Sequence, residues 1–144
     1  MPIARWFAIA VIASLLGVAV PSGWAQLETT KILFESTRDG DSEIYVMDVD
    51  GANPTNLIQS PTSEDVNPEW SADGTRVAFA SDRSGNMDIW VMDADGGNLE
   101  RITTHAASDT KPTWRPDGSE IAFVSDRDGD LEIHVVDVVT KAAE

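Results

Sequence analysis

The sequence predicts an all-β fold: a partial β-propeller of about three four-stranded antiparallel blades, incomplete or closed by self-association. Three observations lead to this prediction. An 18-residue segment occurs three times with seven identical columns, at intervals of 45 and 44 residues. Each period of about 44 residues holds four short β-rich runs separated by Asp-Gly, Pro or Gly, which is the size of one blade. Apolar residues alternate with a period of two, and no stretch beyond residue 25 has a helical period.

The repeated segment supplies two adjacent strands of each blade. It reads KILFESTRDGDSEIYVMD from Lys31, RVAFASDRSGNMDIWVMD from Arg76 and EIAFVSDRDGDLEIHVVD from Glu120. Its identical columns include the aromatic residues Phe34, Phe79 and Phe123 and the arginines Arg38, Arg83 and Arg127. The Gly at the centre of each copy predicts a hairpin turn between the two strands.

A second shared unit precedes the second and third copies, as NPEWSADG over 67–74 and KPTWRPDG over 111–118. Its tryptophans, Trp70 and Trp114, are 44 residues apart. Each unit reads as a short strand that ends in a tight Asp-Gly turn. The blades are therefore expected at about 31–59, 66–104 and 110–140. They hold three, four and three strands, because the first copy has no Trp strand before it and the last has no fourth strand after it.

The two faces of each hairpin indicate how the blades pack. Arg83 and Asp88 flank the loop 84–87, so in the simplest register they lie opposite each other and Phe79 faces Met92. Both faces are then apolar, as in a sheet that is covered by neighbouring sheets on both sides. A two-sheet sandwich is the alternative, but its strands would not need to repeat so closely.

The repeated arginines are interpreted as structural. In the same register they pair with an acid across each hairpin loop, as Arg38 with Glu43, Arg83 with Asp88 and Arg127 with Glu132. An exposed cross-strand pair of this kind contributes about 0.2–1 kcal/mol. Glu35 stands where Ala80 and Val124 stand in the later copies, which suggests a charge on a face that no preceding blade covers.

These residues resemble the WD40-like (PD40) repeat of TolB-type propellers. One copy matches its pattern with Pro112, Trp114, Pro116, Asp117 and Gly118. The other matches with Pro68, Trp70, Ser71, Asp73 and Gly74, and Ala72 replaces the usual proline. The resemblance implies TolB-like propeller repeats over residues 26–144 and a protein-interaction role in an envelope-associated complex. The alternative is the detached propeller of a prolyl-oligopeptidase-like hydrolase without its catalytic domain.

The N-terminus predicts export. Arg5 precedes a largely apolar run of 15 residues, Trp6–Val20, and small residues precede a cut before Gln26, which is the layout of a signal peptide over residues 1–25. A membrane anchor is the alternative, but 15 residues fall short of the roughly 20 that span a bilayer. We therefore expect a periplasmic or secreted protein with no membrane span after cleavage.

The composition indicates which classes of partner the protein is expected to bind. The chain has 10 basic and 25 acidic residues, a formal net charge of −15, and no cysteine. An acidic surface repels phosphate backbones, so nucleic acid is not an expected partner, and no disulfide can form. Protein partners are expected instead. The open end blades also suggest a homodimer that would complete the propeller.

The sequence favours a non-enzymatic protein without cofactor or metal. Clustered acids such as Asp126, Asp128 and Asp130 lack the spacing of a calcium-binding EF-hand loop, and they also suit hairpin turns. No Gly-x-Ser-x-Gly motif is present. Of the two histidines, His134 occupies the column of an aromatic residue and is interpreted as a packing ring, whereas His105 lies in a loop.

The remaining binding candidates are Asp65 and Asp109, which are 44 residues apart and lie five residues before each Trp. The family resemblance places them at the mouth of the central channel, where propellers often bind ligands. The alternative is a capping or turn aspartate.

Overall fold

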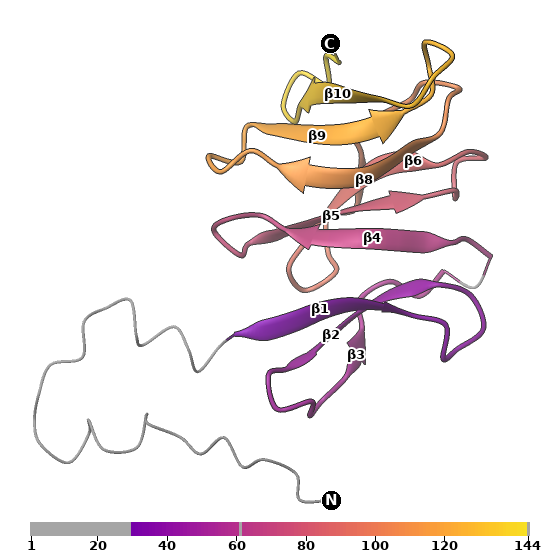
Figure 1. Cartoon of the computed structure of the whole chain (residues 1–144). Helices are drawn as coiled ribbons and strands as arrows, with labels where there is room; N and C mark the ends of the chain where they lie inside the picture. Colours follow the sequence, from indigo (N-terminus) through magenta and orange to yellow (C-terminus); the bar gives the residue numbers. More distant parts are fainter. Residues whose placement is uncertain (1–29, 61, 144) are drawn as a thin grey trace, which may run out of the picture. The chain divides into compact units, whose positions relative to one another are not determined.

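The computed structural model describes residues 30–60 and 62–143, and the predicted signal peptide lies outside them. The compact unit that begins at Lys31 consists of ten strands in three antiparallel sheets (Figure 1). The described part of the chain contains no helix that is long and apolar enough to cross a membrane. The predicted all-β, partial propeller is therefore confirmed.

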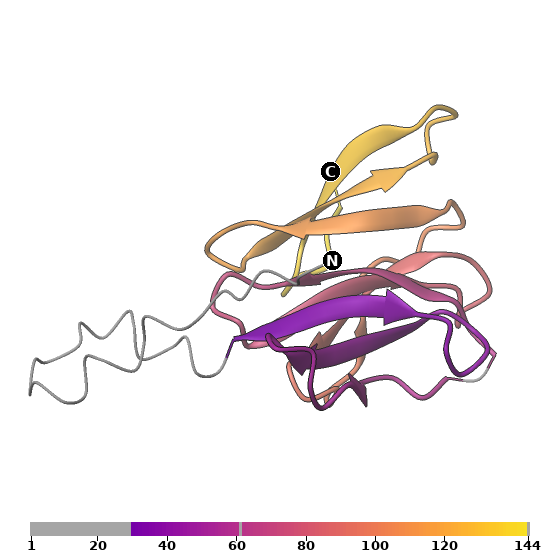
Figure 2. The same ribbon diagram turned by 60° about the horizontal axis from the view of Figure 1, so that its bottom comes forward.

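Each sheet is one blade. Blade 1 comprises β1 (Lys31–Ser36), β2 (Glu43–Asp48) and β3 (Thr55–Asn56). Blade 2 comprises β4 (Asp65–Trp70), β5 (Arg76–Ser81), β6 (Asp88–Asp93) and β7 (Glu100–Arg101). Blade 3 comprises β8 (Asp109–Trp114), β9 (Glu120–Ser125) and β10 (Glu132–Asp137). Within each sheet the strands follow chain order, and Figures 1 and 2 show the three sheets layered one after another.

The hairpin register differs from the prediction by two residues. Ser81 pairs with Asp88 and Phe79 with Trp90, so the predicted Phe79–Met92 and Arg83–Asp88 pairings are wrong. The loop is longer than expected because Gly85 adopts a φ of 109° and its N–H bonds Asp82, which closes a tight turn inside it. Arg83 therefore belongs to the loop and not to the strand.

A β-bulge interrupts the Trp strand of blades 2 and 3. The register shifts between Val66 and Glu69 in β4 and at the equivalent place in β8. Asn67 and Lys111, each followed by proline, have φ values of 54° and 51°. Proline has no N–H to give to the sheet, so a bulge is where a strand tolerates it.

The two junctions between blades use equivalent positions. Blade 1 buries Ile44 and Ile58 against Val77, Phe79 and Met92 of blade 2. The opposite face of blade 2 carries Ala78, Ala80, Ile89 and Val91 and packs against Trp114, Ile121 and Phe123 of blade 3. Both faces of blade 2 are therefore buried, as the apolar pattern predicted. Burial of this kind is worth roughly 25 cal/mol per Å² of apolar surface.

One face at each end of the series is not covered by another blade of the described chain. Ile133 of β10 is 76% exposed, whereas its equivalents Ile89 and Ile44 are fully buried. At the other end Ile32 is 38% exposed, whereas its equivalent Val77 is buried.

The prediction that Glu35 marks an uncovered face is wrong. Its Oε2 accepts a hydrogen bond of 3.1 Å from the backbone N–H of Asn67, so the side chain points toward blade 2. The equivalent residue of blade 2, Ala80, likewise faces the next blade along the chain. The carboxylate satisfies an amide that the bulge in β4 removes from the ladder.

Candidate functional site

The two candidate binding aspartates open the first strands of their blades. Asp65 begins β4 and pairs with Ser81, and Asp109 begins β8 and pairs with Ser125. Neither aspartate has exposed surface. Each already has a cationic partner, because Arg83 Nη2 lies 2.7 Å from Asp65 and Arg127 Nη2 lies 3.1 Å from both oxygens of Asp109.

The arginine of each pair is held by the hairpin loop that carries it. Nε of Arg83 donates to the hydroxyl of Ser81 at 2.9 Å. Its guanidinium also lies over the rings of Phe79 and Trp90, at 5.5 and 5.1 Å from their centroids. Blade 3 repeats the arrangement with Arg127, Ser125 and Phe123. A ligand of either aspartate would therefore have to displace a fixed guanidinium.

Asp65 also ties its blade to the preceding one. Its backbone N–H donates to the carbonyl of Ser42 in the hairpin loop of blade 1, and that of Asp109 donates to Met87 of blade 2. Burial raises the pKa of the Asp65 carboxyl, and hydrogen bonds from Ser81 and Arg83 act in the opposite direction. A channel-mouth binding role for the two aspartates remains a prediction.

The predicted arginine–acid pairs across the hairpin loops are wrong, because the register places other partners beside each acid. Asp88 is buried and pairs with Arg101 of β7 at 2.7 Å. Glu43 accepts hydrogen bonds from Asn56 of β3 and from the backbone N–H of Ser60. Arg38, in blade 1, stacks over Tyr45 at 4.5 Å and has no carboxylate partner in the described residues. The described residues of blade 1 form β1, β2 and β3, and include no counterpart of β4 and its Asp65.

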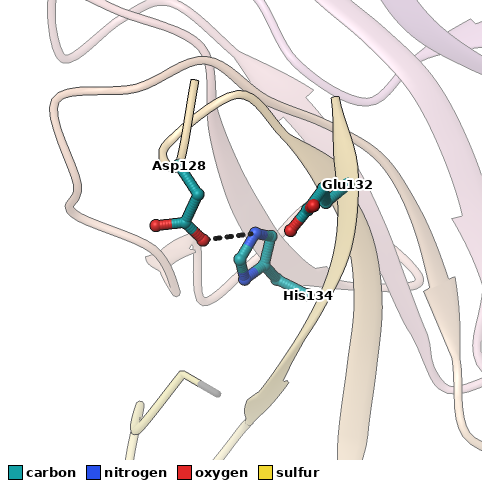
Figure 3. A group of neighbouring side chains, drawn as sticks. All are labelled: Asp128, Glu132 and His134. Carbon is teal, nitrogen blue, oxygen red and sulfur yellow. Dashed lines mark ion pairs between the residues drawn. The ribbon is translucent and has the colours of Figure 1, made fainter. Parts of the chain in front are cut away.

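A group that the sequence analysis did not single out lies on the blade 3 hairpin. Asp128, Glu132 and His134 place one donor atom each within 4.8 Å of one another. Nε2 of His134 lies 3.6 Å from Oδ2 of Asp128 (Figure 3). His134 does pack as predicted, since its ring lies 5.9 Å from that of Phe123. The sequence offered one indication of this group, because His134 stands at the repeat position that Tyr45 and Trp90 occupy in the other copies.

A surface pocket of about 410 Å³ lies between the segment that follows β7 and the C-terminal part of blade 3. Its lining includes Thr104, His105, Arg127 and Lys141. Arg127 is already paired with Asp109, and Lys141 with Glu100 at 2.8 Å. The loop residue His105 accepts a hydrogen bond from the N–H of Ala107 through Nδ1.

The serines that recur in the repeat are engaged in the scaffold. Ser81 and Ser125 are buried and hold their arginines, as Ser36 holds Arg38. Such hydroxyls are fixed by guanidinium groups and not by a general base, which a nucleophilic serine requires.

Comparisons with known proteins agree with the repeat. The family model described as the TolB beta propeller domain (PD40) matches residues 8–105 and 67–144. No curated protein matches the sequence.

Solved structures share the fold. A putative TolB from Agrobacterium tumefaciens is 29% identical with a TM-score of 0.73, over 82% of this chain and 45% of that one. TolB from Acinetobacter baumannii is 26% identical with a TM-score of 0.67, over 79% and 29%. A puromycin-hydrolyzing peptidase from Mycobacterium tuberculosis is 18% identical with a TM-score of 0.62, over 81% and 19%. This chain therefore spans less than half of each of these proteins.

Proposed function

Because this chain belongs to the TolB beta propeller domain family, we propose that it is a non-catalytic protein-binding module that works in the periplasm or as a secreted protein. The pattern of the first 25 residues supports export. The proposed partners are proteins, in an envelope-associated complex or as a second copy of the chain, and not nucleic acid.

The observation that carries this proposal is the apolar face of blade 3. Leu131 and Ile133 are each 76% exposed there, at the side of β10 that the other blades use to pack on their successor. Exposed apolar patches of this kind mark protein–protein contacts. The complement of such a face is the opposite face of a blade, which the chain itself offers at Ile32. A second copy could therefore dock head to tail.

Light scattering on the purified chain tests the proposal. We expect the wild-type chain to associate and the Ile133→Lys variant to be monomeric, because a charge at the centre of an apolar contact costs several kcal/mol. Val139→Lys is the control, since Val139 is 86% exposed and lies beyond Asp137, the last residue of β10. It should associate as the wild type does.

Ile32→Lys identifies the partner face. If two copies dock head to tail, this variant dissociates as Ile133→Lys does. If only Ile133→Lys dissociates, the association uses the blade 3 face alone. A monodisperse wild-type monomer at micromolar concentration would contradict the proposal of self-association.

The second candidate, a detached propeller of a hydrolase, is favoured by the likeness to the puromycin-hydrolyzing peptidase, of which this chain spans 19%. That likeness concerns the fold alone at 18% identity. The coding sequence beside this one distinguishes the candidates. A neighbouring Ser-Asp-His hydrolase domain would favour the hydrolase, and further repeats or envelope genes would favour the binding module.

A further inference from the structure

We propose that Asp128, Glu132 and His134 bind one divalent transition-metal ion, of which Zn²⁺ is the best match. The site lies on the blade 3 hairpin and is separate from the exposed apolar face that the proposed function uses.

The backbone brings the three side chains together. Glu132 and His134 are two residues apart on β10, so they project from the same face of the strand. Asp128 comes from the loop that precedes β10 and returns over this face. Figure 3 shows the imidazole between the two carboxylates, with Nε2 toward Asp128.

The geometry fits a small cation. The three donor atoms lie within 4.8 Å of one another. Zinc takes imidazole nitrogen and carboxylate oxygen at about 2.0–2.2 Å, so its donors lie roughly 3–4 Å apart. Asp128 and Glu132 are exposed, so their side chains have room to rotate toward a bound ion.

The donor set selects the class of metal. One imidazole with two carboxylates suits zinc and its neighbours, whereas calcium prefers a full set of oxygen ligands. Three protein ligands leave a fourth position of a tetrahedral ion for water or a ligand from a partner. The net charge of −15 also attracts cations to this surface.

The imidazole is held in place before any ion arrives. His134 is 9% exposed, pairs with Phe123 across β9 and β10, and packs its ring against that side chain at 5.9 Å. A ligand that is already oriented loses little conformational freedom on binding.

In the other two blades, the acids at the equivalent positions have hydrogen-bond or ion-pair partners within the protein. In blade 1, Asp39 accepts a hydrogen bond from the Tyr45 hydroxyl, and Glu43 accepts one from Asn56 of β3. In blade 2, Asp88 accepts from Ser84 and pairs with Arg101 of β7. In blades 1 and 2 these acids therefore already have hydrogen-bonding or charged partners.

Blade 3 differs from blades 1 and 2 in the partners of its acids and in the residue that occupies the aromatic column. In the described residues no hydrogen bond or ion pair joins the carboxylate of Asp128 or Glu132 to a lysine, arginine or amide side chain, and the residue in the aromatic column is His134. A divalent cation would neutralise the negative charge of these two neighbouring carboxylates and would also accept the imidazole nitrogen as a ligand.

Isothermal titration of the untagged, metal-free chain with zinc chloride tests the proposal. We expect one zinc ion per chain, with an affinity that calcium chloride does not approach. His134→Tyr recreates the column of blade 1, so it should keep the fold and weaken zinc binding at least tenfold. Asp128→Asn should have the same effect.

The matched controls remove equivalent groups elsewhere. His105→Ala deletes the only other histidine of the sequence, and Asp39→Asn changes the blade 1 residue that corresponds to Asp128. Both should bind zinc as the wild type does. Carbon-13 NMR of the wild-type imidazoles gives a readout without substitution, since substoichiometric zinc should shift the signals of His134 and not those of His105. Unchanged binding by His134→Tyr and Asp128→Asn, or shifts at His105 alone, would overturn the proposal.

Discussion

Nη2 of Arg83 lies 2.7 Å from Oδ1 of Asp65, and the same pair recurs as Arg127 with Asp109. The carboxylates have no exposed surface, and the arginine side chains are 16% and 14% exposed. Each pair connects the β-hairpin loop of a blade to the start of its Trp strand. The repeated arginine is therefore the counter-ion of the repeated aspartate, and not of the acid across its own loop.

Removal of Arg83 should be far more costly than removal of an exposed arginine. Arg83→Ala leaves Asp65 buried without its counter-ion, so we expect the free energy of unfolding to fall by about 3–5 kcal/mol. Arg38→Ala is the control at the same column, where the stacking on Tyr45 and the hydrogen bond to Ser36 are lost but no buried charge is left behind, and should cost about 1–2 kcal/mol. Urea denaturation measures both. Similar losses for the two variants would contradict a buried ion pair as the source of the effect.

The double substitution Arg83→Met with Asp65→Leu separates the ion pair from the packing around it. Since neither charge then remains buried, the variant should recover most of the stability that Arg83→Ala loses. A double variant that is no more stable than Arg83→Ala would show that the packing of the guanidinium matters more than its charge.

Acidification should destabilise the chain through its turn aspartates. Hydrogen bonds from the Ser71 hydroxyl and from Thr75 lower the pKa of Asp73 from 3.8 to about 2, and similar bonds lower the pKa of Asp117 and Asp137. A lowered pKa in the folded state stabilises it while the group is ionised. The contribution of Asp73 is therefore complete above about pH 4 and is lost as the pH falls toward about 2.

The pH dependence of urea denaturation tests this prediction. Asp73→Asn should reduce the loss of stability between about pH 4 and pH 2. Asp65 acts in the opposite direction, because burial raises its pKa and protonation then favours the folded state. An Asp73→Asn profile parallel to that of the wild type would contradict the role of this turn.

Gly96 should tolerate alanine less well than its equivalent, Gly51. Both glycines have positive φ, 89° and 85° respectively, so both substitutions carry the strain of a left-handed conformation, about 1–2 kcal/mol. Only at Gly96 would the added Cβ collide with the carbonyl oxygen of Leu57 in blade 1, whereas Gly51 has open space. Gly96→Ala should therefore lower the thermal midpoint further, because blades 1 and 2 must separate to accommodate it. Equal midpoints would show that this close approach is easily relaxed.

Export predicts a defined mature N-terminus. Mass spectrometry of the protein from a cell's extracytoplasmic fraction should find a chain that begins at Gln26. If residues Trp6–Val20 are retained and the protein sediments with membranes, the anchor interpretation is correct instead.

The repeat made most of the fold predictable. The ten strands of the three blades were predicted from the repeated Phe34, Phe79 and Phe123 and from the spacing of Trp70 and Trp114. An internal repeat allows this because one strand assignment must fit every copy. The hairpin register was not predictable from alternation alone. It depends on the turn at Gly85, which moves Arg83 out of the strand.

The candidate site was predictable only in part. The equivalence of Asp65 and Asp109 followed from spacing, but their burial as charged groups depends on the arginine that the hairpin loop of the same blade supplies. The cluster around His134 could not be predicted, because it depends on the loop that brings Asp128 back over β10. The alignment of His134 with aromatic residues does not show that a carboxylate lies beside it.

The equivalence of the two blade junctions has a consequence for how such a chain can change its length. Ile44 meets blade 2 as Ile89 meets blade 3, so every junction joins one kind of face to the other kind. A tandem duplication of one 44-residue unit within the gene would insert a blade whose two faces already match both neighbours. A single residue inserted within a strand would instead move the following side chains to the opposite face of the sheet, whereas the intervals of 45 and 44 residues show that a loop absorbs such a change. Duplication or loss of a whole unit is therefore the change of length that preserves the contacts between blades.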